Sequence, residues 1–361
     1  MTFSRLPSDH TIGIIGSGQL GLMIVLESAR LGVKFNVLGN KRDYVCKFAK
    51  CFDNSEDTKF LDDSTLVTFE FEQGNEEAMI KASDEGKLVP EYKNVWMKIE
   101  RDREKQFLFE NGFPVARFVI AQNGKEALKI IRDEFNWSAV IKKVRGGYNG
   151  KGQYYIRNMN YDPQIEKINE KVVVEEFIEF DHESSIIVTR SNSEFVSYPV
   201  SHNVNKEGIL LYNYGPIRSY GEKEIARKLA DKLNYRGTMG IEFFVNNGKA
   251  IINEFSPRVH NSGHYTTNSS FTSQFENHIR GISNSPLGAT NTLNYFGMIN
   301  LLGVPSIDPL VENYGNIFWY NKENTTPRRK VGHINISGES IDEVINKIEI
   351  IQKMIFTQRT S

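Results

Sequence analysis

A predicted β-hairpin near residue 250 constrains the fold more than any other part of this sequence. Its first strand covers residues 241–245, and its second strand begins at residue 251 and is ended by Pro257. Residues 246–248 read Asn-Asn-Gly, which is a turn signal of the hairpin kind. The second strand continues into a dense polar run, N-E-F-S-P-R-V-H-N-S-G-H, over residues 253–264. The sequence therefore predicts two antiparallel strands that lead directly into a cluster of chemically active side chains.

The register of this hairpin decides whether its two glutamates meet. A three-residue loop over residues 246–248, with Gly248 in a left-handed conformation, places Glu242 opposite Ile252. Glu254 then lies diagonally from Glu242 on the same face, roughly 7–8 Å away at the backbone. Two such carboxylates can hold Mg²⁺, which prefers hard oxygen ligands. A loop of even length would put Glu254 on the opposite face, and a solvent-exposed hairpin is the simpler alternative.

Composition excludes several classes of protein. The chain has 361 residues, 39% hydrophobic and 25% charged with a net charge of −1, which suits two or three globular domains and argues against bulk nucleic-acid binding. Its two cysteines, Cys46 and Cys51, are expected to be free thiols in a reducing compartment. We find no secretion signal and no apolar run approaching about 18 residues, so a cytoplasmic location is expected.

The first 38 residues predict the β-α-β opening of a doubly wound sheet. The expected elements are strands at residues 11–15 and 34–38 and a helix over residues 20–31. The glycine fingerprint at residues 16–21 lets a helix N-terminus approach a phosphate or another anion. An NAD site needs an acidic residue after the second strand, where this chain has Gly39-Asn40. The sequence thus argues against a dehydrogenase and leaves a phosphate-bearing ligand.

A further strand of the same sheet is expected at residues 64–72. Glu70 and Glu72 share one face of it, and Glu72 stands at the carboxyl end, which lines the ligand crevice in a doubly wound sheet. A solvent-facing glutamate is the alternative.

A glycine-rich segment over residues 145–153 connects predicted strands at residues 139–144 and 154–156. No helix follows it and no G-K-[ST] closes it, so it is not a Walker A loop. Its backbone N–H groups can fold over a polyphosphate, and Lys142 on the flanking strand can reach the same phosphates. A mobile surface hairpin is the alternative.

Another predicted strand, over residues 172–178, is expected to be buried and carries two glutamates near its end. Its backbone can pair with an adenine edge while a carboxylate takes the ribose hydroxyls. The remaining expected helices cover residues 99–112, 125–134, 222–233 and 273–282, with a last helix after Ser340; further strands are expected at residues 195–200, 209–212, 298–302, 317–320 and 331–336. The basic turn at residues 325–330 either holds a phosphate or is a solvated run of charge.

Taken together, five motifs resemble the ATP-grasp superfamily, and within it the N5-carboxyaminoimidazole ribonucleotide synthetase family. The motifs are N-E-F-S-P-R-V-H-N-S-G-H (residues 253–264), S-Q-F-E-N-H (273–278), G-S-G-Q-L-G (16–21), G-G-Y-N-G-K-G-Q (146–153) and R-K-V-G-H (329–333). The resemblance covers nearly the whole chain. It implies an α/β fold that is α+β in its catalytic part: a Rossmann-like pre-ATP-grasp domain (1–98), an ATP-grasp domain with a glycine-rich lid (99–290) and a small C-terminal α/β domain (291–361).

The resemblance also implies an activity. Members of the family are ATP-dependent ligases of purine biosynthesis that convert bicarbonate and 5-aminoimidazole ribonucleotide to the N5-carboxylated nucleotide, through carboxyphosphate. Mg²⁺ is the expected cofactor and ATP a co-substrate. A homodimer is expected, with the product passed to a downstream mutase and with no nucleic-acid or membrane partner.

Specific residues follow from the resemblance by position. Those expected at ATP are Arg101, Lys142, Gly147, Tyr148, Asn149, Gly150, Lys151, Gly152, Gln153, Glu175, Glu176, Phe177, Ile178, Glu183, His202, Asn253 and Glu254. Those expected at the aminoimidazole nucleotide are Gln19, Glu72, Tyr148, Arg329 and Lys330. Arg258, His260 and Asn261 are expected at bicarbonate and, with Lys142, to be catalytic. Glu242 and Glu254 are the expected magnesium ligands.

Three positions depart from the family's usual pattern. Asn149 replaces a usual aspartate, which puts a proton-accepting role there in doubt, and Leu22 replaces a common basic residue. Ser256 stands where many other ATP-grasp enzymes have a metal-binding asparagine. The competing hypotheses are another ATP-grasp carboxylate–amine ligase or a formate-dependent transformylase, a nicotinamide dehydrogenase, and a non-catalytic nucleotide sensor.

Overall fold

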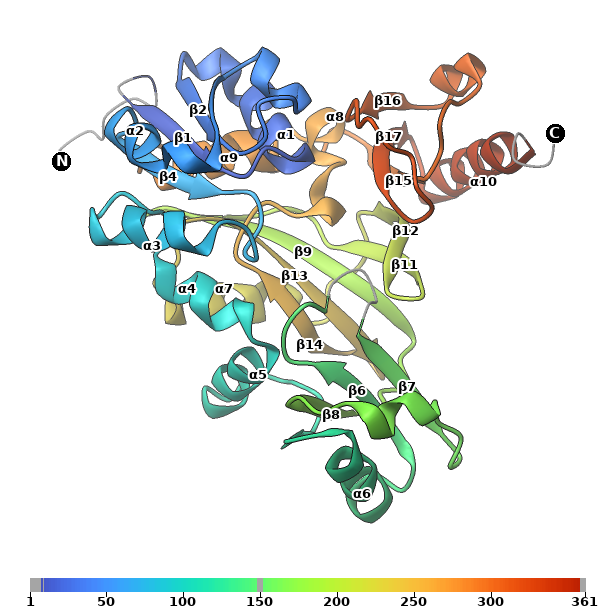
Figure 1. Cartoon of the computed structure of the whole chain (residues 1–361). Coiled ribbons are helices and arrows are strands. Elements are labelled where there is room, and N and C mark those ends of the chain that lie inside the picture. Colours follow the sequence, from blue (N-terminus) through green and yellow to red (C-terminus); the bar gives the residue numbers. More distant parts are fainter. Residues whose placement is uncertain (1–7, 9, 148–151, 358–361) are drawn as a thin grey trace.

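The fold is built on three sheets, which the computed structural model describes over residues 8, 10–147 and 152–357. Figure 1 shows the N-terminal sheet at the top, the long central sheet below it, and a small sheet at the bottom that faces the central hairpin. This arrangement confirms the predicted α/β class, with a doubly wound N-terminal part and mixed catalytic part.

The N-terminal sheet is parallel, with strand order β3-β2-β1-β4. Its strands are β1 (Thr11–Ile15), β2 (Lys34–Leu38), β3 (Lys50–Phe52) and β4 (Leu66–Phe69), and its helices are α1 (Gln19–Ser28), α2 (Asp57–Asp62) and α3 (Glu76–Asp84). Apolar residues of β1 and β2 alternate between two buried clusters, one on each face, as a doubly wound sheet requires. The strand expected over residues 64–72 is shorter than predicted, so Glu70 and Glu72 lie beyond its end.

Glu70 occupies the anion site of the glycine fingerprint. Its carboxylate accepts hydrogen bonds from the backbone N–H groups of Gly18 (2.5 Å) and Gly21 (2.8 Å). These donors open helix α1, where partial positive charge attracts an anion. At these two donors the anion that the fingerprint was expected to attract is therefore a side chain of the protein itself.

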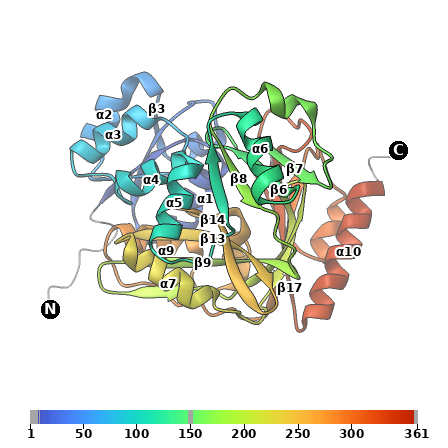
Figure 2. The same cartoon turned by 90° about the horizontal axis from the view of Figure 1, so that it is seen from below.

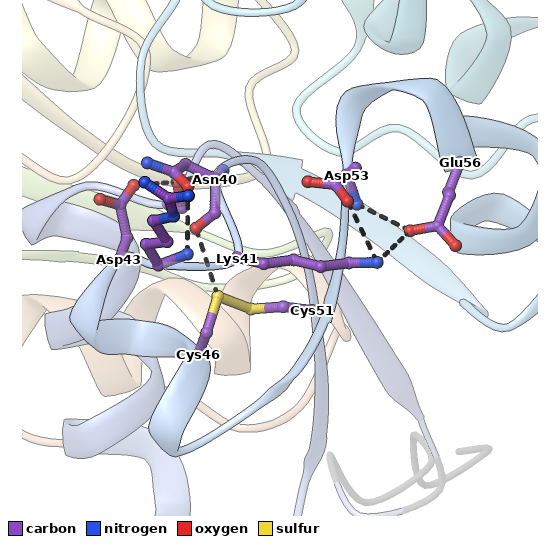
Figure 3. The surroundings of a disulfide bond; sticks show 9 residues. Asn40, Lys41, Asp43, Cys46, Cys51, Asp53 and Glu56 are labelled. Atoms are coloured by element: carbon purple, nitrogen blue, oxygen red, sulfur yellow. Dashed lines mark hydrogen bonds and ion pairs between the residues drawn. A yellow bond between two sulfur atoms is a disulfide. The ribbon is translucent and has the colours of Figure 1, made fainter.

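Cys46 and Cys51 form a disulfide, so the prediction of free thiols is wrong (Figure 3). Cys46 lies in the 3₁₀ turn Tyr44–Lys47, and Cys51 lies in β3, which places the two Cα atoms 5.5 Å apart. The bond closes the connection between β2 and β3. Figure 3 shows Lys41 beside it, paired with Asp53 and Glu56.

The small sheet has antiparallel strand order β5-β8-β6-β7. Its strands are β5 (Phe118–Ala121), β6 (Ser138–Lys143), β7 (Gln153–Arg157) and β8 (Val172–Glu176), with α6 (Gly124–Glu134) packed on one face. Helices α4 (Tyr92–Ile99) and α5 (Arg101–Glu110) connect it to the N-terminal sheet. The glycine-rich segment joins β6 to β7, and residues 148–151 of it lie outside the described residues.

The central sheet runs β14-β13-β9-β11-β12-β15-β17-β16, with β10 paired to β9. The strands are β9 (His182–Arg190), β10 (Phe195–Ser197), β11 (Ser201–Lys206), β12 (Ile209–Gly215), β13 (Gly237–Asn246), β14 (Lys249–Ser256), β15 (Tyr295–Leu302), β16 (Asn316–Trp319) and β17 (Lys330–Gly338). The sheet is continuous through the β12–β15 pair, so the C-terminal strands extend the catalytic sheet. Four strands, β3, β5, β9 and β11, were not predicted.

Helices cover the central sheet and anchor its neighbours. Figure 2 shows α7 (Glu222–Lys232) and α9 (Gln274–Ile282) lying along β9 and β13, and α10 (Ile341–Thr357) over the C-terminal strands. Phe275, Ile279 and Ile282 of α9 are buried against α1, which fixes the N-terminal sheet to the central one. In the described part of the chain, no helix has both the length and the apolar character needed to span a membrane.

The β13–β14 hairpin forms as predicted, but its register differs. Asn246 pairs with Lys249, and Asn247 (φ 49°) and Gly248 (φ 70°) form a two-residue turn with left-handed backbone instead of the expected three-residue loop. Phe243 pairs with Ile252, yet Glu242 pairs with Glu254, so Asn253 is an extra residue in β14. This β-bulge restores the shared face that an even loop would have removed.

Replacing both cysteines by serine should lower the free energy of unfolding by about 2 kcal/mol, because a short cross-link restricts the unfolded chain. Urea denaturation of the oxidised wild type and the double variant measures this difference. Alkylation in denaturant supplies the control: Cys46 and Cys51 should react only after reduction. Full alkylation without a reductant would contradict the disulfide.

Candidate functional site

A cavity of about 790 Å³ is lined by side chains from all three sheets and from their connections. Gln19 and Glu72 come from the N-terminal part, Lys142 and Glu175 from the small sheet, and Lys330 from the C-terminal strands. The volume lies at the upper end of the range usual for ligand pockets. The cavity therefore has the size of a ligand-binding site.

Glu242 and Glu254 are paired across β13 and β14 and both line the cavity. Burial and the neighbouring Glu254 and Glu183 carboxylates raise the pKa of Glu242. Burial also opposes ionisation of Glu254, but Lys98 and Arg101 outweigh it and hold its pKa well below the usual range. Lys98 Nζ lies 3.4 Å and Arg101 Nη1 3.5 Å from Glu254 Oε2.

This carboxylate pair fits a hard divalent cation. Within the described residues, the one basic group at ion-pair distance from Glu242 is His260, whose Nε2 lies 3.9 Å from Oε1. In the same part of the chain, no three or more His, Cys, Asp or Glu side chains are grouped to hold a metal ion. Mg²⁺ is commonly bound in proteins by one or two carboxylates, with water and phosphate as further ligands.

Glu175 holds a cluster of cations at the other wall of the cavity. Its Oε2 lies 2.9 Å from Lys142 Nζ and 3.1 Å from Lys105 Nζ. Burial opposes its ionisation, but Lys105, Lys142 and Arg101 lower the pKa of Glu175 to about 2. Burial lowers the pKa of Lys142 to about 8 against the attraction of Glu175. Glu175 Oε1 and Arg101 Nε are buried without a hydrogen-bond partner among the described residues.

Helix α5 supplies functional residues that sequence reasoning missed. Lys105, fully buried, donates to the backbone carbonyl of Asn253 at the bulge (2.9 Å). Glu104 binds Lys98 at 2.8 Å and accepts from the backbone N–H of Phe255 at 3.0 Å. One face of the helix carries Arg101, Glu104, Lys105 and Leu108. Charged residues on the same face as a core leucine are unusual, and this pattern could have indicated buried functional groups.

Arg258 connects the N-terminal part to the polar run after β14. Its Nε donates to Glu72 Oε2 at 2.5 Å and its Nη1 to the carbonyl of Val259 at 3.0 Å. Glu72 is buried, so the solvent-facing alternative is wrong. The pairing desolvates both charges and leaves Arg258 exposed mainly toward the cavity.

His260 and Asn261 follow on a short 3₁₀ turn, Asn261–Gly263. Gln274 of α9 fixes the turn by accepting from His260 N (2.9 Å) and donating to His260 O (2.6 Å). Burial, together with Arg258 and Lys330, lowers the pKa of His260 to about 3, so this imidazole is neutral. Both side-chain amide atoms of Asn261 are buried and lack a partner within the described residues.

Lys330 reaches the cavity because of a second bulge. Leu301 pairs with Gly332 and Leu302 with Lys330, so Val331 is extra in β17. Val331 joins the C-terminal core, and Lys330 turns to the cavity face. Burial lowers its pKa to about 8. The predicted strand at residues 331–336 gave no sign of this irregularity.

Most of the predicted site residues line the cavity. They are Gln19, Glu72, Arg101, Lys142, Gly147, Gln153, Glu175, Glu176, Phe177, Ile178, Glu183, Glu242, Asn253, Glu254, Arg258, His260, Asn261 and Lys330. Gly152, His202 and Arg329 are not brought to its wall. His202 instead stacks between His182 and Tyr214 on β11, at ring-centroid distances of 5.2 and 4.7 Å. Tyr148, Asn149, Gly150 and Lys151 lie outside the described residues.

Sequence reasoning also missed Lys322 and Asn205. Lys322 donates to Gln19 Oε1 at 2.6 Å, which links the loop after β16 to the glycine fingerprint. Asn205 donates to Glu183 Oε2 at 2.7 Å and lines the cavity. Neither residue belongs to one of the five motifs, so the sequence carried no local signal for them.

Three family models match successive parts of the chain. They describe a ribonucleotide synthetase preATP-grasp domain (residues 9–98), an ATP-grasp domain (106–275) and a phosphoribosylaminoimidazole carboxylase C-terminal domain (297–347). The first match covers the N-terminal sheet, the second covers the small sheet and the first strands of the central sheet, and the third covers the C-terminal strands that extend the central sheet.

Whole-chain relatives agree with these matches. N5-carboxyaminoimidazole ribonucleotide synthase of Saccharolobus solfataricus is 47% identical over 360 residues, covering 98% of both chains. Among solved structures, an ADP complex of N5-carboxyaminoimidazole ribonucleotide synthetase is 32% identical with a TM-score of 0.91 over 100% of both chains. The Staphylococcus aureus N5-carboxyaminoimidazole synthetase complexed with ADP is 26% identical, with a TM-score of 0.89 over 96% of this chain and 98% of that one.

Substituting Glu175→Gln should destabilise the protein by about 3 kcal/mol at neutral pH, because it leaves three buried cations without their shared carboxylate. The folded-state pKa of about 2 lies below the ordinary value of 4.5, so this contribution is complete above pH 4.5 and is lost as pH falls toward 2. Denaturation of both proteins at pH 7 and at pH 3.5 should therefore show a smaller difference at the lower pH.

Glu170→Gln is the matched control, since Glu170 forms an exposed ion pair with Lys143. It should change stability by less than about 1 kcal/mol. Equal effects of the two substitutions would contradict the role assigned to the buried cluster.

Proposed function

The chain belongs to the N5-carboxyaminoimidazole ribonucleotide synthase family of ATP-grasp ligases, and we propose that it carboxylates 5-aminoimidazole ribonucleotide with ATP and bicarbonate. The products are N5-carboxyaminoimidazole ribonucleotide, ADP and phosphate, in purine biosynthesis. The match to relatives of that name over nearly the full length of both chains supports this substrate set.

The observation that carries the proposal is the position of Arg258 in the cavity. Glu72, from the N-terminal part, binds Arg258, while Lys142 of the small sheet and Glu254 of the β13–β14 hairpin line the same cavity. In this proposal Arg258 lies between the part of the cavity that binds ATP and the part that binds the second nucleotide. A cation there suits a reaction in which a phosphorylated intermediate forms at the first part and is consumed at the second. Neutral His260 and the unpartnered amide of Asn261 stand beside it and can hydrogen-bond a carbonate oxygen.

ATP is proposed to lie between the small sheet and the β13–β14 hairpin. Residues 176–178 would meet the adenine edge, Glu183 the ribose, and Lys142 with Arg101 the phosphates. Lys142 is suited to this role because Glu175 and Asn253 Oδ1 (3.2 Å) hold its ammonium in one place. In phosphoryl transfer, the protein contributes mainly positioning and neutralisation of charge.

Glu242 and Glu254 would hold Mg²⁺. When bound there, the ion neutralises phosphate charge during transfer. The raised pKa of Glu242 supports this assignment, because a buried carboxylate without its own cation is a group that a metal ion stabilises.

The reaction divides into two steps that balance. A bicarbonate oxygen attacks the γ-phosphorus of ATP, the bond to ADP breaks, and carboxyphosphate forms. The amine nitrogen of the nucleotide then bonds to the carboxyl carbon, the carbon–oxygen bond to phosphate breaks, and the amine proton leaves with phosphate. Gln19, Glu72 and Lys330 are proposed to hold the nucleotide, and Arg258 stabilises the negative charge that passes between the two steps.

The cellular setting is proposed on chemical grounds. The product is a labile carbamate, which favours direct use by a downstream mutase in the cytoplasm. Phe271 and Leu293, 61% and 58% exposed, lie on adjacent backbone segments and offer an apolar surface that supports a homodimer.

ADP release from Mg²⁺-ATP and bicarbonate should increase strongly when 5-aminoimidazole ribonucleotide is added, with a carboxylated product. A coupled spectrophotometric assay with and without the nucleotide measures this. ATP turnover that is indifferent to the nucleotide but depends on formate or another carboxylate would support the transformylase or a different carboxylate–amine ligase.

Glu254→Gln should raise the Mg²⁺ concentration needed for half-maximal turnover at least tenfold, because it removes one of two anionic ligands. Apparent Mg²⁺ affinity of the wild type should increase with pH, since Glu242 must lose its proton. Thermal stabilisation by Mg²⁺-ADP gives a readout independent of turnover. Exposed Glu179→Gln is the control, and an unchanged Mg²⁺ requirement in Glu254→Gln would contradict the assignment.

A further inference from the structure

We propose that Asn205 is a positioning residue that orients the Glu183 carboxylate toward the ribose hydroxyls and so sets the preference for a ribonucleotide. The inference rests on the proposed ATP site. It concerns a residue outside every sequence motif, on the strand where Asn205 lines the cavity and His202 does not.

Glu183 lies on the cavity face of β9 between two neighbouring strands. It pairs with Phe244 of β13 on one side and with Asn203 of β11 on the other. Asn205 is two residues further along β11, so it is the diagonal neighbour of Glu183 on the same face. Its Nδ2 donates to Glu183 Oε2 at 2.7 Å, and both side chains line the cavity.

A third bulge lies beside this contact. Val204 pairs with Tyr212 and Asn205 with Leu210, so Leu211 is the extra residue on β12. The irregularity sets Leu210 opposite Asn205, and both line the cavity. His202 lies on the other face of β11, where its ring stacks on His182 and Tyr214. Because successive side chains of a strand point to opposite faces, Asn205 lies at the cavity and His202 does not.

The chemistry of the pair suits recognition of vicinal hydroxyl groups. A carboxylate accepts from two hydroxyls only if it is ionised and held in one rotamer. Among the described residues, Asn205 is the one side chain that hydrogen-bonds Glu183. Burial raises the pKa of Glu183, and the hydrogen bond from Asn205 opposes that rise because it favours the ionised carboxylate.

The test compares kcat/KM for ATP, 2′-deoxy-ATP and 3′-deoxy-ATP at saturating Mg²⁺, bicarbonate and 5-aminoimidazole ribonucleotide. The wild type should prefer ATP at least tenfold over one or both analogues, and Glu183→Gln should reduce that preference to within twofold. Asn205→Asp keeps the shape but removes the donor. It should lower kcat/KM for ATP about tenfold, which is the usual effect of one hydrogen bond to a charged group. The kcat/KM for the less preferred deoxy analogue should change less than twofold.

Two further variants separate positioning from folding. Asn205→His retains an N–H donor and should keep the preference within threefold of the wild type. Lys206→Ala changes the exposed next residue of β11 and should leave all three values unchanged. If Asn205→Asp does not fold, Asn205→Ala is measured instead, by calorimetry of ADP against the two deoxy-ADP analogues, where the same loss of preference is expected.

Equal loss for ATP and both analogues in the Asn205 variants would overturn the inference, as would a wild type that does not prefer ATP. A changed Mg²⁺ requirement with an intact ribose preference would also overturn it, because Glu183 would then serve the metal site. The proposed function fails separately, if the wild type makes no carboxylated nucleotide at all.

Discussion

One extra residue in the β13–β14 ladder, Asn253, is the constraint on which the site depends. With the observed two-residue turn, an unbroken ladder would turn Glu254 toward the core and Phe255 toward the cavity. The bulge keeps Ile252 and Phe255 in the hydrophobic core and sets Glu254 opposite Glu242. Bulges in β12 and β17 act in the same way, bringing Leu210 and Lys330 to the cavity wall while Val331 packs inside.

The bulges add Glu254 and Lys330 to a cavity that is also lined by buried charges. Neighbouring cations stabilise two of the cavity's carboxylates: Glu175 lies between Lys105 and Lys142, and Glu254 lies beside Lys98 and Arg101. Arg258 with Glu72 extends the arrangement toward the N-terminal part. The positive groups are thus fixed before substrate binds, which is the condition for stabilising charge that develops during phosphoryl transfer.

The sequence predicted the architecture better than the side-chain contacts. Strands β1 and β2 were located correctly because apolar runs and glycines mark their ends, and the hairpin was found from its turn signal. The register of the hairpin was not predicted correctly, because a bulge depends on which apolar residues pack in the core. The spacing of Ala250, Ile252 and Phe255 breaks the period of two and could have indicated the bulge. Glu70, Lys105 and Asn205 act through partners distant in sequence, and the Cys46–Cys51 bond depends on the approach of two segments.

The account's central claim is that one cavity couples ATP cleavage to carboxylation of an amine. Its most direct test is ¹³C NMR of a reaction with labelled bicarbonate, Mg²⁺-ATP and 5-aminoimidazole ribonucleotide, with ADP measured in the same sample. The account predicts one labelled carbamate, bonded to the exocyclic nitrogen, for each ADP formed. ADP formation without label in the nucleotide would contradict it.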